Sequence, residues 1–348
     1  MKPLRIAICT GSIPFVRGGA EALTDILAEQ LRQKGHAVEI ISIPFRWYPK
    51  EEILKGYLAW RLINLDESEG KPIDRVIALK FPAFVVRHPH KVTWLVQQFR
   101  QVYDLFGTEY SHFDSSEQDA ELRRVIRHID THTLSESNRI FAISDNVRNR
   151  LRRFNGLECE TLYPPPALDG RFCNSGYGDY VFTISRLNRM KRVDHLIRAL
   201  AQTRTPVCCR IAGQGEELAS LQRLANEVGA ADRVEFLGYV NDKEALALYA
   251  GALAVYYAPF DEDYGLVTVE AMKSQKAVLT TSGSGGVLEF VEDGVTGFVT
   301  PAGDALVLAR RIDELYEDRR LAERMGRAGE PRVSSIDWDI TIAKLLEA

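Results

Sequence analysis

The chain has 348 residues, of which 45% are hydrophobic and 26% are charged, and its formal net charge is −4 at pH 7. This composition is typical of a soluble globular protein of two domains, and the negative balance argues against nucleic acid as a partner. The five cysteines form no C-x-x-C pair, and no apolar run reaches the roughly 18 residues of a membrane span, so we expect a cytoplasmic protein without a zinc site.

The first half of the chain alternates predicted strands and helices. Residues 4–9 and 38–43 are apolar runs, and residues 20–34 between them carry leucine and isoleucine at helical spacing. A strand, a helix and a strand in this order predict a parallel, doubly wound sheet. Gly18 and Gly19 precede the helix, where backbone N–H groups suit an anion. The loop lacks G-x-G-x-x-G, which disfavours a dinucleotide-dependent dehydrogenase.

Two further segments of the first half carry basic side chains. Residues 46–65 mix tryptophan, tyrosine and leucine with arginine and lysine, which predicts an amphipathic helix either packed on the sheet or lying at a membrane surface. A helix that opens at Ser144 carries four arginines between Arg148 and Arg153. This basic face is either solvated or in contact with anionic lipid or a phosphate-bearing acceptor.

Polar side chains follow the strand that we predict at residues 92–96. Gln97, Gln98 and Arg100 come directly after it. Because open α/β sheets bind ligands at the carboxyl ends of their strands, these three residues are candidates for ligand binding.

Three successive prolines at residues 164–166 mark the end of the first half. Proline cannot continue a helix or occupy a central strand, so this segment predicts a stiff hinge. Strands and helices alternate again from residue 180 onward. We therefore expect one domain at residues 1–166 and a second at residues 167–332, with a ligand cleft between them.

Positive side chains follow the first predicted strand of the second half. Arg186 and Lys191 lie in the segment SRLNRMK, ahead of the next helix. A guanidinium group offers a fork of donors to phosphate oxygens, and an ammonium group offers a point charge. Later strands end in turns at Gly213 and Gly238, where the backbone can approach a ligand closely. These features predict a phosphate-bearing ligand at one edge of the second sheet.

An acidic turn follows the apolar run at residues 252–258. Its sequence, FDEDYGLVTVEAM, places Glu262 before a helix and Glu270 inside it, with Gly265 between them. A helix N-terminus favours an anion such as phosphate, and two carboxylates can accept hydrogen bonds from hydroxyl groups. A capped helix start with solvated acids is the alternative.

Five segments in this order resemble the donor half of the retaining glycosyltransferases of family 4, which have the GT-B fold. They are SRLNRMK, IAGQGEE, VEFLGYV, FDEDYGLVTVEAM and SGGVLEFVEDGVTGF. The resemblance implies two Rossmann-like, doubly wound parallel-sheet domains that face each other across a cleft. The first domain would bind the acceptor and the second the nucleotide-sugar donor, and a final helix at residues 333–348 would pack back on the first domain.

The resemblance also implies roles for individual residues. Arg186 and Lys191 would hold the donor diphosphate, Glu270 the ribose hydroxyls, and Glu262 would face the donor sugar. The acceptor candidates are Gln97, Gln98 and Arg100. The other donor-binding candidates are Gly18 and Gly19, which would close on the diphosphate, the nucleobase turn Gly238, Tyr239 and Val240, and Gly213, Gly265 and Leu266.

The sequence departs from the family pattern at two places. The usual E-G-F-G-L-P turn reads Glu262-Asp263-Tyr264-Gly265-Leu266-Val267, so a charge at Asp263 bears on which donor sugar fits. Gln97 and Gln98 stand where a histidine is common in the family. The acceptor side is therefore less closely matched than the donor side.

The predicted function is transfer of a hexose from a UDP- or GDP-linked sugar, with retention of configuration, to a glycan or lipid-linked acceptor in polysaccharide or glycolipid biosynthesis. We expect the cations at the edge of the second sheet to replace a metal, and we expect no cofactor. Retention then implies attack on the face that the leaving phosphate occupies, with Glu262 as a covalent nucleophile as the alternative.

Three other functions are compatible with the same scaffold: a sugar-nucleotide epimerase, a phosphorylase and a non-catalytic sugar-nucleotide-binding module. We expect no nucleic-acid partner. The aromatic and basic side chains at residues 46–65 make peripheral contact with the inner face of the membrane a further hypothesis.

Overall fold

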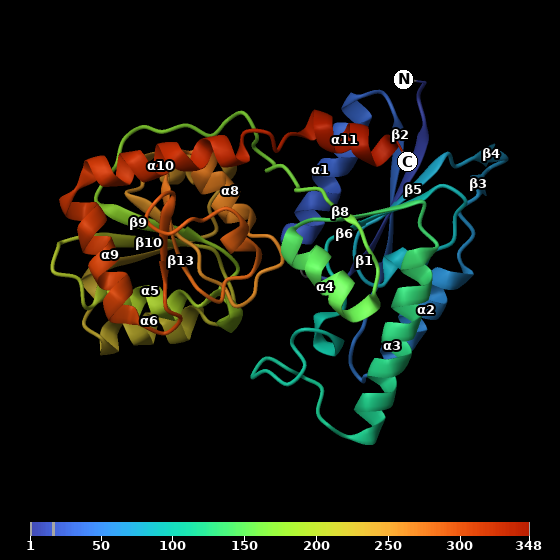
Figure 1. The fold of residues 1–348 in the computed structure, drawn as a ribbon, viewed down its shortest axis with the longest axis horizontal. Coiled ribbons are helices and arrows are strands. Elements are labelled where there is room, and N and C mark those ends of the chain that lie inside the picture. The colour runs from blue at the N-terminus through green and yellow to red at the C-terminus, as the bar shows by residue number, and fades with distance from the viewer. Residues whose placement is uncertain (1, 16–17, 348) are drawn as a thin grey trace. The chain divides into compact units, whose positions relative to one another are not determined.

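A computed structural model describes residues 2–15 and 18–347 and shows two compact units (Figure 1). Unit 1 comprises Met1–Ala167 and Trp338–Ala348, and unit 2 comprises Leu168–Asp337. Val16 and Arg17, which belong to the expected glycine loop, lie outside the described residues. Each unit contains one six-stranded parallel sheet, which confirms the predicted α/β class with two parallel-sheet domains.

The sheet of unit 1 has the strand order β2-β1-β5-β6-β7-β8. Its elements are β1 (Arg5–Ser12), α1 (Gly19–Gln33), β2 (Ala37–Pro44), α2 (Glu52–Leu62), the short pair β3 (Glu67–Ser68) and β4 (Lys71–Pro72), β5 (Arg75–Ala78), β6 (Lys91–Leu95), α3 (Glu117–Ser135), β7 (Arg139–Ala142), α4 (Asp145–Asn155), β8 (Glu160–Thr161) and α11 (Trp338–Leu346). The central strands are almost wholly buried, as expected for a parallel sheet that is covered on both faces.

Helix α11 belongs to unit 1 although it follows unit 2 in the sequence. The indole N–H of Trp338 donates to the carbonyl of Pro166 at 3.3 Å, and its ring meets the ring of Trp94 edge-on at 6.4 Å. The three prolines at 164–166 are buried within unit 1 rather than exposed as a spacer. The division between the units therefore falls just after them.

The sheet of unit 2 has the strand order β11-β10-β9-β12-β13-β14. Its elements are β9 (Tyr180–Ile184), the short helix η3 (Arg189–Lys191), α5 (Val193–Leu200), β10 (Cys208–Ala212), α6 (Leu218–Glu227), β11 (Val234–Gly238), α7 (Asp242–Gly251), β12 (Ala254–Tyr256), α8 (Leu266–Lys273), β13 (Ala277–Thr281), the short helix η5 (Gly286–Glu289), β14 (Gly297–Thr300), α9 (Ala305–Glu317) and α10 (Arg319–Val333).

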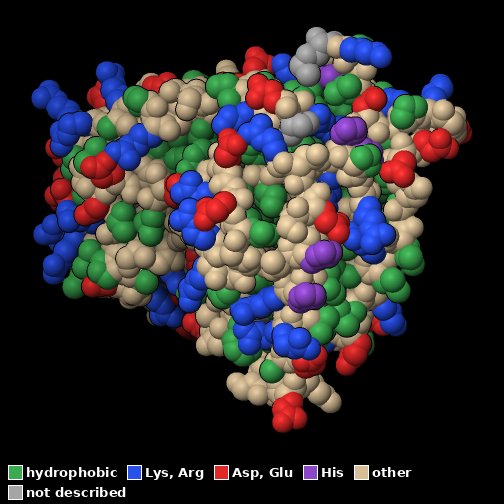
Figure 2. Space-filling view, turned by 45° about the vertical axis from the view of Figure 1, so that its right-hand side comes forward, with side chains coloured by type: hydrophobic (Ala, Val, Ile, Leu, Met, Phe, Trp, Pro, Cys, Tyr) green, Lys and Arg blue, Asp and Glu red, His purple; other side chains and the backbone are tan. Residues whose placement is uncertain are grey.

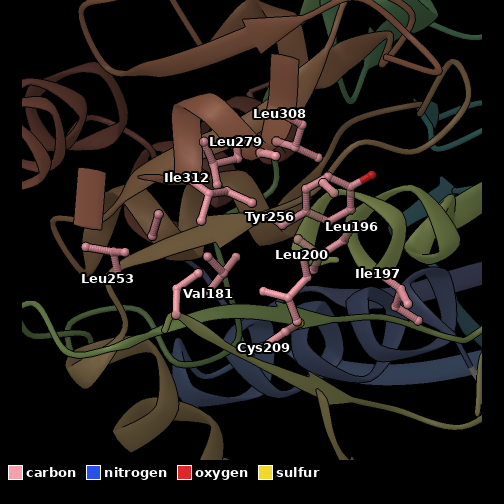
Figure 3. Packing of buried hydrophobic residues seen from close by; sticks show 14 of the residues in the cluster. Val181, Leu196, Ile197, Leu200, Cys209, Leu253, Tyr256, Leu279, Leu308 and Ile312 are labelled. Atoms are coloured by element: carbon pink, nitrogen blue, oxygen red, sulfur yellow. The ribbon is translucent and has the colours of Figure 1, made fainter. Parts of the chain in front are cut away.

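The core of unit 2 lies between this sheet and helices α5 and α9 (Figure 3). Leu196 and Leu200 of α5, four residues apart on one face, pack with Leu308 and Ile312 of α9 in the same buried cluster. Tyr256 of β12 lies in this cluster, and its hydroxyl donates to the backbone carbonyl of Arg192 at 2.9 Å. This packing fixes the sheet edge from which the site loops emerge.

Helix α2 differs from the sequence expectation. Helix α2 begins at Glu52 instead of spanning residues 46–65, so the preceding aromatic residues are not helical. Helix α3 begins at Glu117 because the hydroxyl of Ser116 accepts the backbone N–H of Asp119 at 3.3 Å and caps it. Across the described part of the chain, no helix combines the length and apolarity needed to span a membrane.

Candidate functional site

Five loops emerge at the carboxyl edge of the unit 2 sheet. Because its strands are parallel, the loops after β11, β10, β9, β12 and β13 lie along this edge in that order. They carry, in the same order, Gly238, Gly213, Arg186 with Lys191, Glu262, and the glycine turn at 283–286. The structure thus gathers the candidates of the second half along a single edge.

Lys191 and Glu262 form an ion pair at this edge. Nζ of Lys191 lies 2.5 Å from Oε2 of Glu262, and it also donates to the hydroxyl of Tyr257 at 3.0 Å. Burial alone would lower the pKa of Lys191, but the carboxylate and the phenol raise it, so the ammonium stays charged. The two partners are 71 residues apart in the sequence, so no spacing rule predicts their contact.

Backbone hydrogen bonds hold the acidic turn against its neighbours. They run from the N–H of Phe260 to the carbonyl of Met190 at 2.7 Å, from that of Asp261 to Gly283 at 2.8 Å, and from that of Gly286 to Glu262 at 2.8 Å. Gly285 has φ +59°, and a Cβ there would lie 2.5 Å from the carbonyl oxygen of Glu262. Only glycine permits this approach, so the turn that carries Glu262 is fixed in place.

Gly213 supports the loop that carries Arg186. Its φ is +121°, and a Cβ there would lie 1.8 Å from the carbonyl oxygen of Ser185. A Cβ on Gly215 would meet the carbonyl of Leu187 at 2.1 Å. The Arg186 side chain is exposed, and among the described residues no carboxylate pairs with it. The guanidinium is therefore accessible to a ligand.

Glu270 accepts a hydrogen bond from a buried tyrosine. The hydroxyl of Tyr249, on α7, donates to Oε2 of Glu270 at 2.7 Å, and the Tyr249 ring packs edge-on against Phe182. Burial raises the pKa of Glu270 to about 7, although the bond from Tyr249 acts in the opposite direction. Gly265 precedes α8 with φ +86°, and a Cβ there would meet Val287 at 2.7 Å. Sequence reasoning missed Tyr249, because it lies 21 residues before Glu270 on a different helix and no motif links the two.

The turn after β11 presents an exposed aromatic ring. Gly238 has φ +66°, and its carbonyl accepts the N–H of Gly213 at 2.7 Å. Tyr239, the next residue, is 78% exposed. A backbone hydrogen bond therefore joins the turns at Gly213 and Gly238, and the aromatic side chain of Tyr239 follows directly after the second turn.

Unit 1 has a cavity of about 250 Å³ at the carboxyl edge of its own sheet. We call it the unit 1 pocket, and it is lined by Gly11, Ile13, Phe45, Trp47, Lys80, Phe81, Gln97, Gln98, Phe99, Arg100, Gln101 and His112. The acceptor candidates Gln97, Gln98 and Arg100 are thus brought together. Sequence reasoning missed Phe45, Lys80 and Phe81, although each follows closely after the end of strand β2 or β5 and the rule that selected Gln97 and Gln98 applies to them.

Glu21 links the glycine loop to the unit 1 pocket. Its carboxylate accepts hydrogen bonds from the ammonium of Lys80 and from the backbone N–H of Gly18, the latter at 2.9 Å. Gly18 and Gly19 precede and begin α1, as expected, but the N–H of Gly18 is already occupied. An anion at this helix end would have to displace Glu21 or use the next N–H groups.

Three of the four arginines of α4 pair with carboxylates, so this helix does not present a freely solvated basic face. The pairs are Arg148 with Asp145 at 3.0 Å, Arg150 with Asp104 at 3.0 Å, and Arg152 with Glu158 at 2.8 Å. Arg150 is buried, with 4% of its surface exposed. On the face that Figure 2 shows, basic and acidic side chains are likewise interspersed. The lipid-binding role considered for this helix loses its main support.

Residues 176–332 match the family described as Glycosyl transferases group 1. The chain is 31% identical over 166 residues to a D-inositol 3-phosphate glycosyltransferase of Streptomyces avermitilis. This alignment covers 44% of this chain and 36% of that protein. It is 24% identical over 349 residues to the N-acetyl-alpha-D-glucosaminyl L-malate synthase of Bacillus anthracis, covering 91% and 89% of the two chains. The chain thus spans only about a third of the length of the Streptomyces protein.

Among solved structures, HepE from Anabaena in complex with UDP and glucose aligns with a TM-score of 0.73 at 21% identity. The alignment covers 99% of this chain and 98% of HepE, so the likeness includes both parallel-sheet units. The family match covers residues 176–332, a little under half of the chain, and the structural likeness over both units shows the GT-B fold.

Proposed function

We propose that this protein transfers a sugar from a nucleoside-diphosphate sugar to a hydroxyl group of an acceptor, with retention at the anomeric carbon. The observation that carries the proposal is the gathering of Arg186, the Lys191–Glu262 pair and Glu270 at one sheet edge. The match of residues 176–332 to the group 1 glycosyl transferases supports it, and so do the glycosyltransferase name of the Streptomyces relative and the UDP and glucose present with HepE.

Each residue of this edge has a distinct task in the proposal. Arg186 and Lys191 stabilise the negative charge that grows on the diphosphate as the glycosidic bond breaks. Glu270 accepts hydrogen bonds from the ribose hydroxyls. Glu262 orients the sugar and also holds Lys191 in place at 2.5 Å before the donor binds. The exposed ring of Tyr239 provides a surface for the base.

Same-face attack accounts best for retention in this site. A carboxylate that is bound by an ammonium at 2.5 Å has part of its negative charge committed to that contact, which weakens Glu262 as a covalent nucleophile. The acceptor hydroxyl would instead pass its proton to the departing phosphate. Because two fixed cations supply the charge that a divalent metal would bring, we expect activity to persist in EDTA.

The acceptor, on this proposal, binds in the unit 1 pocket, where Gln97, Gln98 and Arg100 lie with aromatic side chains. Ligand pockets are mostly apolar and contain a few placed polar groups, and this pocket has that character. A glycan or lipid-linked acceptor in polysaccharide or glycolipid biosynthesis would present its terminal ring there.

A thermal-shift screen tests the donor part of the proposal. A ligand that binds only the folded state at 100 times its Kd stabilises that state by about 2.7 kcal/mol, which raises the melting temperature by a few degrees. We expect a UDP- or GDP-linked sugar to raise it, and Arg186→Ala to abolish the shift. A wild-type protein that no nucleotide sugar stabilises would contradict the proposal.

We expect the affinity for the nucleoside diphosphate to fall as the pH is lowered from 8 to 6. The pKa of Glu270, raised by burial to about 7, makes it ionised at pH 8 and largely protonated at pH 6. The ionised carboxylate accepts the stronger hydrogen bonds from ribose hydroxyls. Calorimetric titration at several pH values measures the effect, and Glu270→Gln should remove it. A wild-type affinity that does not change over this range would refute the ribose assignment.

We further propose that α2 makes peripheral contact with a membrane surface. Leu54, Leu58 and Leu62 lie on one face of the helix at four-residue spacing and are 36%, 57% and 74% exposed, while Trp60 is buried. We expect the protein to co-sediment with anionic vesicles and Leu58→Glu to weaken this. Leu306→Glu, at a leucine of unit 2 that is 45% exposed, is the matched control. Equal recovery of wild type in the supernatant with and without vesicles would exclude the contact.

A further inference from the structure

A buried chain of hydrogen bonds leads from the unit 1 pocket into the core of unit 1. The amide Nε2 of Gln98 donates to Oδ1 of Asn155 at 2.6 Å. Nδ2 of Asn155 donates to the hydroxyl oxygens of Thr131 at 2.7 Å and Tyr103 at 3.4 Å. Tyr103 donates in turn to Asp130 at 2.6 Å. Gln98 is therefore held by a network, not by the pocket surface alone.

The network decides which atom of the Gln98 amide is left for a ligand. The hydroxyl proton of Thr131 is committed to the carbonyl of Arg127 at 2.7 Å, so this hydroxyl can only accept from Asn155. Asn155 must then turn its NH₂ group towards Thr131 and its oxygen towards Gln98. That oxygen requires one N–H of the Gln98 NH₂ group, so the Gln98 carbonyl faces away from Asn155 and is the acceptor that stays without a donor.

No described residue donates to this carbonyl, Oε1 of Gln98, although Gln98 lines the pocket and is 99% buried. A buried oxygen without a donor is unfavourable, so a ligand that supplies an O–H proton stabilises the site. A hydroxyl group has such a proton, whereas an ionised carboxylate or phosphate oxygen has none and would be repelled by the carbonyl dipole.

The cations of the unit 1 pocket do not favour an anion strongly either. The ammonium of Lys80 is paired with Glu21, and the guanidinium of Arg100 donates twice to Asp104, at 2.5 and 2.8 Å. The walls are aromatic, and the Phe81 and Phe99 rings stack at 5.1 Å. Such walls suit the C–H faces of a pyranose ring, and the volume of about 250 Å³ suits a single ring.

We propose that the carbonyl of Gln98 binds a hydroxyl group of the acceptor, so that the acceptor presents an uncharged sugar ring to the unit 1 pocket rather than a carboxylate or phosphate. This inference rests on the proposed sugar transfer, because only that function makes the bound sugar an acceptor. Binding of a sugar at Gln98 can nevertheless be measured without catalysis. It makes Gln98 a residue that determines acceptor specificity.

Ligand-observed NMR tests the inference without requiring turnover. The probes are methyl glycosides of glucose, galactose, mannose and N-acetylglucosamine, with L-malate and inositol 3-phosphate as anionic comparisons. Gln98→Met keeps the length of the side chain and removes both polar atoms. The matched control is Gln118→Met, at an exposed position on α3. Should Gln98→Met fail to fold, Gln98→Glu, which keeps an acceptor oxygen, replaces it, and an anionic probe should then be excluded more strongly.

We expect at least one neutral glycoside to bind, and Gln98→Met to weaken it about tenfold, the size of one neutral hydrogen bond, while Gln118→Met has no effect. Nucleoside diphosphate affinity, a unit 2 property, should not change in either variant. The inference is overturned if no neutral glycoside depends on Gln98 or if an anionic probe binds the wild type more tightly. A glycoside that binds through Gln98 but is never glycosylated would instead count against the proposed transfer.

Discussion

Replacing Arg186 with alanine is expected to lower turnover by about 10²–10³-fold, the usual cost of removing one preorganised charge contact from a transition state. The side chain is exposed at the end of β9 and has no carboxylate partner among residues 2–15 and 18–347, so the substitution leaves no buried charge behind. Nucleoside diphosphate affinity should fall as well, because the charge of the diphosphate is present before the bond breaks.

Steady-state kinetics and calorimetry of Arg186→Ala provide the measurement. Arg198→Ala is the matched control, because Arg198 lies on the following helix with 53% of its side chain exposed, and it should keep wild-type turnover. Lys191→Ala should show a loss of similar size, but it also leaves Glu262 without its ammonium partner. Full activity in Arg186→Ala would show that the diphosphate binds elsewhere.

Glu262→Gln and Glu270→Gln are expected to fail in different ways. Glu270, on the ribose reading, contacts a part of the donor whose charge does not change, so its loss should raise KM by a factor that corresponds to about 1–3 kcal/mol. Glu262 faces the sugar, where charge develops, so its loss should lower kcat by more than it changes KM.

The ion pair of Lys191 with Glu262 sharpens this contrast. In the free protein, the Glu262 carboxylate neutralises the ammonium that we assign to the diphosphate. Glu262→Gln removes that competitor, so affinity for the bare nucleoside diphosphate should stay equal or rise, whereas Glu270→Gln should reduce it. Calorimetric titration with UDP and GDP distinguishes the two. Weaker binding in Glu262→Gln with unchanged binding in Glu270→Gln would mean that the roles are reversed.

The fold followed from the sequence because its signals are local. Apolar runs separated by helical periodicity, as at residues 4–43, predict a parallel sheet with helices, and glycines at strand ends mark the ligand edge. The same locality explains the errors. Helix α2 begins later than predicted because apolar side chains also occur ahead of Glu52, in a segment that is not helical. Arg150 is buried because Asp104, which lies in a loop distant in the sequence, pairs with it.

The site was predictable only as separate residues. Sequence order placed Arg186 and Lys191 after one strand and Glu270 inside the helix that follows another, but which side chains touch depends on contacts between distant segments. Glu270 meets Tyr249, and Lys191 meets Glu262, only because β9 and β12 are neighbours in the sheet and α7 lies before β12. The orientation of Gln98 likewise depends on hydrogen bonds to a residue 57 positions away.

The measurement that tests sugar transfer most directly is release of nucleoside diphosphate from the donor chosen by thermal shift, with and without acceptor glycosides. We predict release that rises with acceptor concentration, a product whose anomeric configuration by NMR equals that of the donor, and loss of both in Arg186→Ala. A donor sugar that is epimerised without release would instead show an epimerase. A donor that binds but stays intact with every acceptor would show a binding module, and either result would contradict the proposed transfer.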